Sequence, residues 1–173
     1  MNPFREIWFN TGRCIDYFLI KENRRPYLEE LVWIQGLTSG LLLFLAYDSS
    51  VKFFYLIAPP VVTVLFLRFF CPWLLLKTGK LMNGHATREE LKLVVSLSSI
   101  PYLLSLFYIF LATIIPGKRD YQNGIIDILI WIFVWRILII GVAKTQRISY
   151  VFALMNIAIP AIVLIIFYLI IRY

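Results

Sequence analysis

Two arginines, Arg68 and Arg136, stand inside long apolar stretches, where ionisable side chains are costly and usually serve a function. A guanidinium group can hold a carboxylate or a phosphate through two parallel hydrogen bonds. Glu29 and Glu30 precede the first apolar stretch and could reach the same depth. The four residues therefore predict either an interior ion-pair cluster or a site for a lipid phosphate or a substrate. The simpler interpretation is that the long arginine side chains reach toward the headgroups unaided.

Five long apolar stretches fill most of the 173 residues and must position these charges. A bilayer core about 30 Å thick needs about 20 helical residues, and each stretch approaches or exceeds that length. The chain is 61% hydrophobic with a mean hydropathy of +0.80, which excludes an ordinary soluble domain. The sequence thus predicts an all-α polytopic membrane protein, a single domain over residues 1–173 with a five-helix transmembrane bundle. The expected spans are roughly 31–47, 53–76, 93–115, 125–143 and 151–171.

The distribution of basic residues predicts how these spans are oriented. Most of the 17 Lys and Arg fall before the first span, between the second and third, and between the fourth and fifth. Cytoplasmic flanks accumulate such residues, so we expect a multi-pass protein of the cell membrane with a cytoplasmic N-terminus and an extracytoplasmic C-terminus. The net charge of +7 then attracts anionic lipids, and no nucleic-acid-binding motif accompanies it.

In this topology the two arginines share a depth. At about 1.5 Å per residue, Arg68 lies about 13 Å from Lys77 along its helix, and Arg136 lies about 12 Å from Lys144. Both helices descend toward the cytoplasm. A joint site for an anionic lipid headgroup in the inner half of the membrane is therefore one hypothesis for the pair.

Residues 1–30 form a cytosolic or interfacial segment in which apolar residues recur at helical spacing on both sides of Gly12. The pattern predicts two short amphipathic helices. They could lie on the inner membrane surface or pack against the bundle, and the spacing alone does not separate these alternatives.

Small residues in the first span predict a close helix contact. Gly36 and Gly40 stand four residues apart, which lets another helix approach their shared face. Packing within one chain is the simpler interpretation, and self-association is the alternative.

One carboxylate, Asp127, lies near the outer end of the fourth span. The expected use is an interfacial salt bridge, because a proton-coupling role would need an acidic partner deeper in the bilayer. The residues within possible reach are Asp48, Lys52, Lys118 and Arg119.

The connection between the second and third spans holds the most informative local pattern. Gly84 suits a tight turn. Thr87 and Glu90 have the spacing of a capping box, in which the hydroxyl and the carboxylate each satisfy a free backbone amide. The third helix is therefore expected to begin at about Arg88.

This connection also resembles a known family motif. The motif-bearing residues are Asn83, Gly84, His85, Ala86, Thr87, Glu90, Leu91, Ser98 and Pro101. Their order and distance from the spans resemble the core motif of the Yip (Ypt-interacting protein) domain family. The start of the chain, Asn2-Pro3-Phe4 with Ile7 and Trp8, is similar to the opening signature of its prokaryotic members. Many relatives differ in having Gly-Gly at positions 83–84 and a Pro-Arg pair near positions 11–12.

The resemblance implies a non-enzymatic membrane protein that acts as an adaptor or organiser of membrane partners. Eukaryotic members of the family belong to the early secretory pathway and associate with Rab-type GTPases and with one another. This chain looks like a compact prokaryotic relative, and the GTPase association is not carried over. The family offers no established catalytic residues to place on these positions.

The residues themselves indicate no enzyme, cofactor or metal site. The sole histidine, His85, has no nearby cysteine and no second histidine. No phosphate-binding loop and no nucleophile elbow occur in the sequence. The alternative function is a small lipid or solute transporter or scramblase with kinked helices around Arg68 and Arg136, and a membrane enzyme is a distant third. The expected partners are anionic membrane lipids and membrane proteins, including a second copy of the chain, with no nucleic acid.

Overall fold

The computed structural model describes residues 3–20, 23, 26–47, 52–115 and 123–172, and all regular structure in this part of the chain is helical. The helices in chain order are α1 (Pro3–Phe9), α2 (Thr11–Leu19), α3 (Val32–Ala46), α4 (Ala58–Leu65), α5 (Cys71–Leu81), α6 (Arg88–Leu97), α7 (Tyr102–Ile114), α8 (Gly124–Gln146) and α9 (Tyr150–Arg172). Short 3₁₀ segments, Pro26–Leu31 and Lys52–Leu56, precede α3 and α4, and a π-helical turn, Phe66–Phe70, joins α4 to α5.

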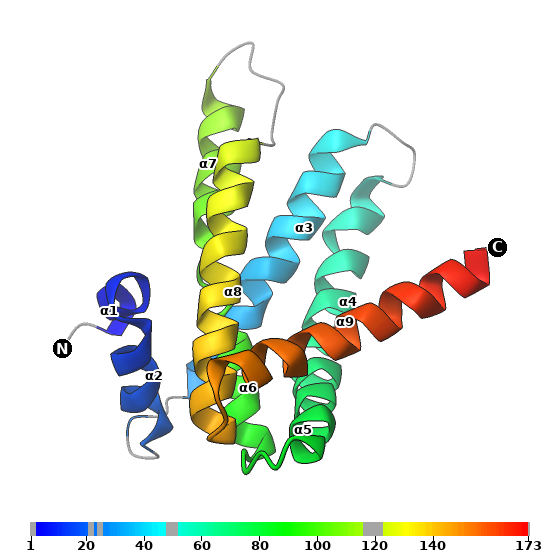
Figure 1. Ribbon diagram of the computed structural model, residues 1–173. Coiled ribbons are helices and arrows are strands. Elements are labelled where there is room, and N and C mark those ends of the chain that lie inside the picture. Colours follow the sequence, from blue (N-terminus) through cyan, green and yellow to red (C-terminus); the bar gives the residue numbers. More distant parts are fainter. Residues whose placement is uncertain (1–2, 21–22, 24–25, 48–51, 116–122, 173) are drawn as a thin grey trace.

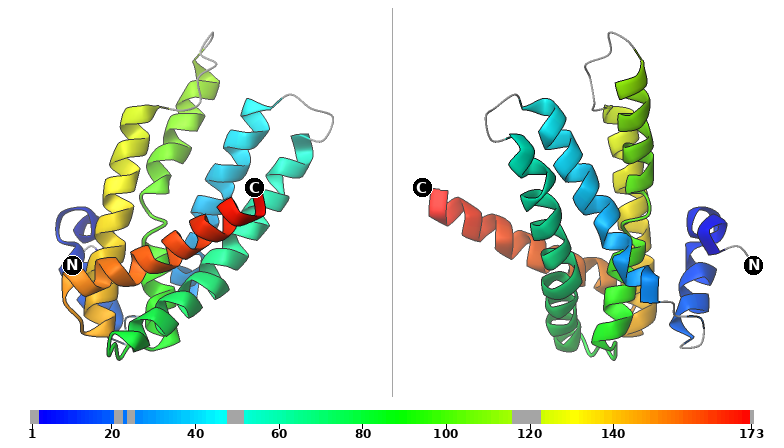
Figure 2. Two further views of the ribbon diagram at one scale, coloured as in Figure 1. Left: turned by 45° about the vertical axis from the view of Figure 1, so that its right-hand side comes forward. Right: turned by 180° about the vertical axis from the view of Figure 1, so that it is seen from behind.

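Four helical stretches are long and apolar enough to cross a membrane, and they fit a multi-pass membrane protein. They are Leu28–Ala46, Lys52–Leu81, Arg88–Ile114 and Gly124–Gln146. Helix α9 corresponds to the fifth predicted span, but its assessed part, Tyr150–Ile162, is shorter than a span. The count of five therefore stays a prediction. Figures 1 and 2 show α9 leaving the other long helices at an oblique angle.

Two helical pairs make up the length of the bundle, α3 beside α4 and α7 beside α8 (Figure 1). They diverge toward the end where α3 and α7 terminate, which we call the hairpin end. Helix α6 lies at the opposite end, packed between α5 and α8. We call that end, which carries the loop between α5 and α6, the motif end.

Helix α6 forms the centre of the protein, because residues 93–101 are all buried. The predicted third span is divided at this point into α6 and α7, with a turn at residues 98–101. Proline lacks the amide that would continue the helical ladder, so Pro101 favours a break here. The hydroxyl of Ser98 donates to the carbonyl of Val95 at 2.7 Å, which satisfies a backbone acceptor beside the break.

Helices α1 and α2 pack against the bundle through their apolar faces. Ile7, Cys14 and Ile15 are buried in one cluster with Ile137 of α8 and Leu97 of α6. The sequence left two alternatives for the N-terminal segment, lying on the membrane surface or packing against the bundle. These buried faces agree with packing against the bundle.

Candidate functional site

The loop between α5 and α6, residues 82–87, is held in place by Gln146 at the end of α8. The backbone carbonyl of Gln146 accepts a hydrogen bond from the amide of His85 at 3.1 Å. Its side-chain Nε2 donates to the carbonyl of Leu75 in α5 at 2.8 Å. The side chain is fully buried, and its Oε1 has no hydrogen-bond partner among the described residues. One residue therefore joins α8, α5 and the loop, which we call the motif loop.

Two glycines make room for this glutamine. A Cβ built on Gly79 would lie 2.0 Å from Gln146 Nε2, and one on Gly84 would lie 1.9 Å from its Oε1. Real side chains do not tolerate such contacts, so the close approach requires glycine at both positions. The positive φ in the motif loop belongs instead to Asn83, at 59°. The turn thus depends on an asparagine for its backbone shape and on a glycine for its space.

The predicted capping box is confirmed. The amide of Glu90 donates to Thr87 Oγ1 at 3.3 Å, and the amide of Thr87 donates to Glu90 Oε2 at 2.8 Å. Helix α6 begins at Arg88, as predicted. Among the other motif residues, Ala86 and Leu91 are buried, whereas His85 is exposed. Pro101 is also buried, at the break between α6 and α7.

A polar cavity of about 360 Å³ borders the motif loop. We call it the motif-end cavity; its lining residues are Leu19, His85, Thr87, Glu90, Lys144, Thr145 and Arg147. Lys144 is paired with Asp16 of α2 at 2.5 Å, which ties α2 to the end of α8. Arg147 ends α8 in a left-handed conformation with φ 57° and is exposed. The cavity therefore carries acidic and basic groups together.

Arg68 lies in the π-helical turn and meets both glutamates named from the sequence. Its Nη1 is 3.0 Å from Glu30 Oε1, and its Nη2 is 3.6 Å from Glu29 Oε2. The other Glu30 oxygen accepts a hydrogen bond from Trp33 Nε1 at 3.0 Å. The Arg68 side chain is 32% exposed, so each ion pair is expected to contribute less than about 1 kcal/mol to stability.

Arg136 has different partners. Its Nη1 donates to the carbonyl of Trp8 at 3.2 Å, and its Nη2 donates to the carbonyl of Phe9 at 3.4 Å. These carbonyls end α1, where the helix dipole favours a cation. Figures 1 and 2 place α1 and the α4–α5 rod on opposite sides of the bundle. The structure therefore does not bring Arg136 and Arg68 into one site, because Arg136 is turned toward α1.

The small-residue face of α3 is filled within the chain. A Cβ on Gly36 would lie 3.0 Å from the carbonyl oxygen of Pro60, and one on Gly40 would lie 2.8 Å from Pro60 Cγ. The two glycines thus allow α4 to approach α3 closely, which agrees with the simpler of the two sequence interpretations.

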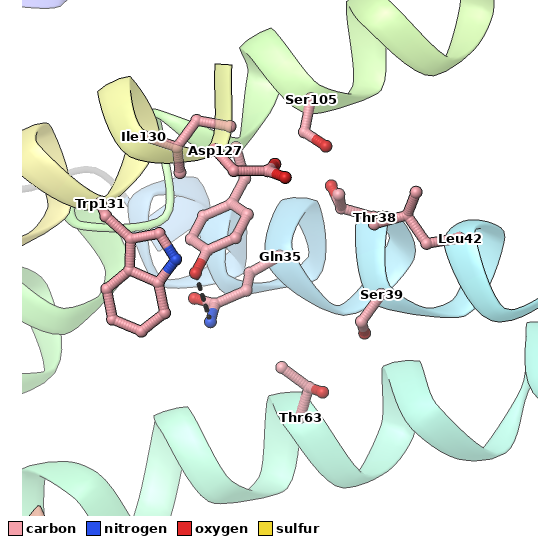
Figure 3. A pocket seen from close by; sticks show the side chains of 10 residues that line it. Gln35, Thr38, Ser39, Leu42, Thr63, Ser105, Asp127, Ile130 and Trp131 are labelled. Atoms are coloured by element: carbon pink, nitrogen blue, oxygen red, sulfur yellow. Dashed lines mark hydrogen bonds between the residues drawn. The ribbon is translucent and has the colours of Figure 1, made fainter. Parts of the chain in front are cut away.

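A second cavity, of about 200 Å³, lies between the spans and was not predicted from the sequence (Figure 3). We call it the span cavity; it is lined by Gln35, Thr38, Ser39, Leu42, Thr63, Tyr102, Ser105, Asp127, Ile130 and Trp131. These residues come from α3, α4, α7 and α8. Gln35 Nε2 donates to the Tyr102 hydroxyl at 3.3 Å, which links α3 to α7 across the cavity.

The sequence carried a signal for this cavity. Gln35, Thr38 and Ser39 have the spacing that places residues on one helical face, and Tyr102 and Ser105 repeat it in another span. The spacing within each helix does not show which helices face one another, so the convergence of several helices on one space could not be predicted from it.

Asp127 lines the span cavity. Its backbone amide donates to the carbonyl of Asn123 at 2.9 Å, but its carboxylate makes no hydrogen bond or ion pair with the residues that the structure describes. Three of its predicted partners, Asp48, Lys118 and Arg119, lie outside those residues. The fourth, Lys52, has its Nζ 5.7 Å from the centre of the Phe44 ring.

Within the described part of the chain, no three His, Cys, Asp or Glu side chains lie close enough together to hold a metal ion. Comparisons with protein-family models, with curated proteins and with solved structures found no match for this chain. Function is therefore inferred from the residues and their geometry.

Proposed function

We propose that this chain is a non-enzymatic integral membrane protein of the Yip type, which organises membrane partners through a motif end that faces the cytoplasm. The observation that carries the proposal is the fixed shape of the motif loop around the buried Gln146. A surface that is already ordered before binding avoids the entropy loss of ordering it in the complex. Such a loop is suited to the recognition of a partner.

The separate roles of the motif residues support the resemblance to the Yip family. Asn83 adopts the left-handed conformation that asparagine and glycine both tolerate, so Asn83-Gly84 can form the turn for which many relatives use Gly-Gly. Gly84 provides the space for Gln146. Thr87 and Glu90 start α6 directly after the loop. The motif thus sets both the shape of the loop and its attachment to the bundle.

The chemistry of the motif-end cavity favours a polar protein segment as the partner. Glu90 adds a negative charge, and the charge of Lys144 is offset by Asp16. A site for a lipid phosphate would need a net excess of donors and positive charge. A mixed lining instead suits a peptide segment that offers both hydrogen-bond donors and acceptors.

Crosslinking in native membranes tests the proposal. The variant combines His85→Ala with Arg147→Ala, two exposed side chains of the cavity lining. The control is Lys80→Ala, an exposed side chain near the end of α5 that is outside that lining. We expect the double variant to lose recovered partners by about tenfold, since two polar contacts of about 0.5 to 1.5 kcal/mol disappear. An unchanged partner set in the double variant would contradict the proposal.

Transport of a lipid or solute around Arg68 and Arg136 has weaker support. The two guanidinium groups bind carboxylates in one case and α1 carbonyls in the other. A shared phosphate site would require one of them to leave its partners. The arginines are therefore proposed to hold the fold together.

A further inference from the structure

The span cavity gathers polar side chains between the helical spans. Ser105 lies nine residues before the end of α7 at Ile114, which corresponds to about 13 Å along the helix axis. Asp127 lines the same cavity from the first turn of α8, near the end of that span. Polar and charged groups at membrane depth must find a partner within the protein, in water or in a ligand.

Several lining oxygens are hydrogen-bond acceptors. The hydroxyl of Thr38 donates to the carbonyl of Ile34 at 2.7 Å, and that of Ser39 donates to the carbonyl of Gly36 at 2.8 Å. Their protons are thus used within α3, and only lone pairs remain for a ligand. The side-chain amide of Gln35 donates one of its two N–H groups to the Tyr102 hydroxyl, and its carbonyl oxygen is a further acceptor.

Three of the oxygen-bearing side chains turn toward one space. Figure 3 shows the carboxylate of Asp127 and the hydroxyls of Thr38 and Ser105 pointing toward one another from α8, α3 and α7. Thr38 and Ser105 are buried, at 2% and 6% exposure, so these groups are not simply surface residues. A carboxylate with hydroxyl oxygens around it is a donor set for a hard cation.

The charge and size of the cavity limit which cation could bind. The described lining contains Asp127 and no Lys, Arg or His, so its formal charge is balanced by one positive charge. Divalent cations of this type usually bind several carboxylates, which this lining does not offer. A volume of about 200 Å³ is several times the roughly 30 Å³ that one water occupies, so a small cation could keep part of its hydration shell.

From this convergence we infer that the span cavity is a binding site for a small monovalent cation, with Asp127, Thr38 and Ser105 as its principal ligands. A carboxylate and hydroxyl oxygens can bind either an alkali ion or a small primary ammonium ion. The site is separate from the motif-end cavity, and its occupancy does not depend on the adaptor role.

Thermal unfolding of the purified full-length protein in lipid nanodiscs tests the site. The probes are the chlorides of sodium, potassium and methylammonium at constant ionic strength, with the chloride of N-methylglucamine, a bulky organic cation, as the reference salt. We expect at least one small cation to raise the melting temperature in a saturable way. Sodium or potassium as the effective probe would assign an alkali ion, and methylammonium would assign an ammonium solute. Equal melting temperatures in all four salts would overturn the inference.

Variants tie the response to the cavity. Asp127→Asn keeps the side-chain shape and removes the charge, and Ser105→Ala removes one hydroxyl. The control is Glu89→Gln, an exposed carboxylate at the motif end that pairs with Lys92. We expect the affinity for the cation to fall at least about tenfold in Asp127→Asn, to fall less in Ser105→Ala, and to stay unchanged in Glu89→Gln.

Direct binding of radioactive sodium or rubidium to the same preparations keeps the test independent of any change in folding stability. Equal binding by the wild type and Asp127→Asn would overturn the inference. The His85→Ala/Arg147→Ala variant should retain the full cation response. Loss of partners in the His85→Ala/Arg147→Ala variant tests the adaptor role alone, and loss of cation binding in Asp127→Asn tests the cation site alone. Either proposal can therefore fail without the other.

Discussion

Gln146 connects more parts of this protein than its position at a helix end suggests. Its backbone carbonyl binds the motif loop, and its side chain binds α5 at the carbonyl of Leu75. Gly79 and Gly84 leave the space that its amide occupies. At the residue scale, the shape of the motif loop thus depends on one buried amide and on two missing side chains.

Gly84→Ala should therefore destabilise the protein. The new Cβ would stand 1.9 Å from Gln146 Oε1, and such overpacking typically costs about 1 to 3 kcal/mol. Gly124→Ala is the matched control, because nothing lies within 4 Å of a Cβ at that position. Thermal unfolding in detergent measures both. Adding Gln146→Ala to Gly84→Ala should cost less than the sum of the two single changes, and equal melting temperatures for the two glycine variants would contradict the close approach.

The thiol of Cys14 should be unreactive at neutral pH. Burial, with a smaller contribution from the charge of Glu6, raises the pKa of this thiol from 9.0 to about 12. Maleimide should label Cys14 at pH 8 at least about a hundredfold more slowly than a cysteine introduced by Arg13→Cys, an exposed neighbour in α2. Labelling of both sites at similar rates would show that α2 is not docked as described.

The same shift gives a pH dependence of stability with a definite sign. The folded state keeps the Cys14 proton at pH values where the unfolded state releases it, so this contribution is fully present below pH 9.0. It is lost as the pH rises toward about 12. Chemical denaturation between pH 8 and pH 11 should show a steeper loss of stability in the wild type than in Cys14→Ala.

At the scale of the elements, Arg136 serves as a tether between α8 and α1. Its two hydrogen bonds end on the last carbonyls of α1, which no residue of α1 itself can satisfy. Lys144 ties α2 to the end of α8 through Asp16. The N-terminal helices are therefore held on the bundle by polar contacts at both ends of their buried apolar faces.

Arg136→Leu should loosen α1. Hydrogen bonds to a charged donor are typically worth about 1.5 to 3 kcal/mol, and their loss should raise deuterium exchange in residues 5–18. Arg68→Leu is the control at a similar predicted depth, since its partially exposed ion pairs are made with Glu29 and Glu30 in the segment Pro26–Leu31 and not with α1. Exchange that rises equally in both variants would contradict the tether.

The positions of these elements were partly predictable from the sequence. Apolar length indicated the spans, and the spacing of Thr87 and Glu90 gave the start of α6, because both signals are local along the chain. The position of Arg136 along α8 follows from the helical rise, but the direction of its side chain depends on how α1 docks. The span cavity requires side chains from separate spans to meet, which only tertiary packing determines.

For the molecule as a whole, the structure separates a packed end from a divergent end. At the motif end, α5, α6 and α8 enclose a buried core that supports the motif loop. Toward the hairpin end the two helical pairs diverge, and the span cavity lies between them. We propose that the two ends serve separate purposes, with protein partners at the cytoplasmic motif end and a small cation between the spans.

The position of helix α9 tests the proposed topology, because that topology makes α9 the fifth span. It is 23 residues long, enough to cross a bilayer if it aligns with the other spans. Two reporter enzymes can be fused to the C-terminus, one that works only outside the cytoplasm and one that works only inside it. The proposed topology predicts that only the first will be active. Activity of a reporter that requires the cytoplasm would place α9 on the membrane surface or in the inner leaflet.

The most direct test of the account is the location of the motif loop relative to the membrane. With the native Cys14 and Cys71 replaced by serine, single cysteines introduced by His85→Cys in the motif loop and by Gly124→Cys at the start of α8 would be labelled with a membrane-impermeant maleimide in intact cells and in inverted vesicles. We predict labelling of position 85 only in inverted vesicles and of position 124 only in intact cells. Labelling of position 85 in intact cells, or of both positions from the same side, would contradict a cytoplasmic motif end.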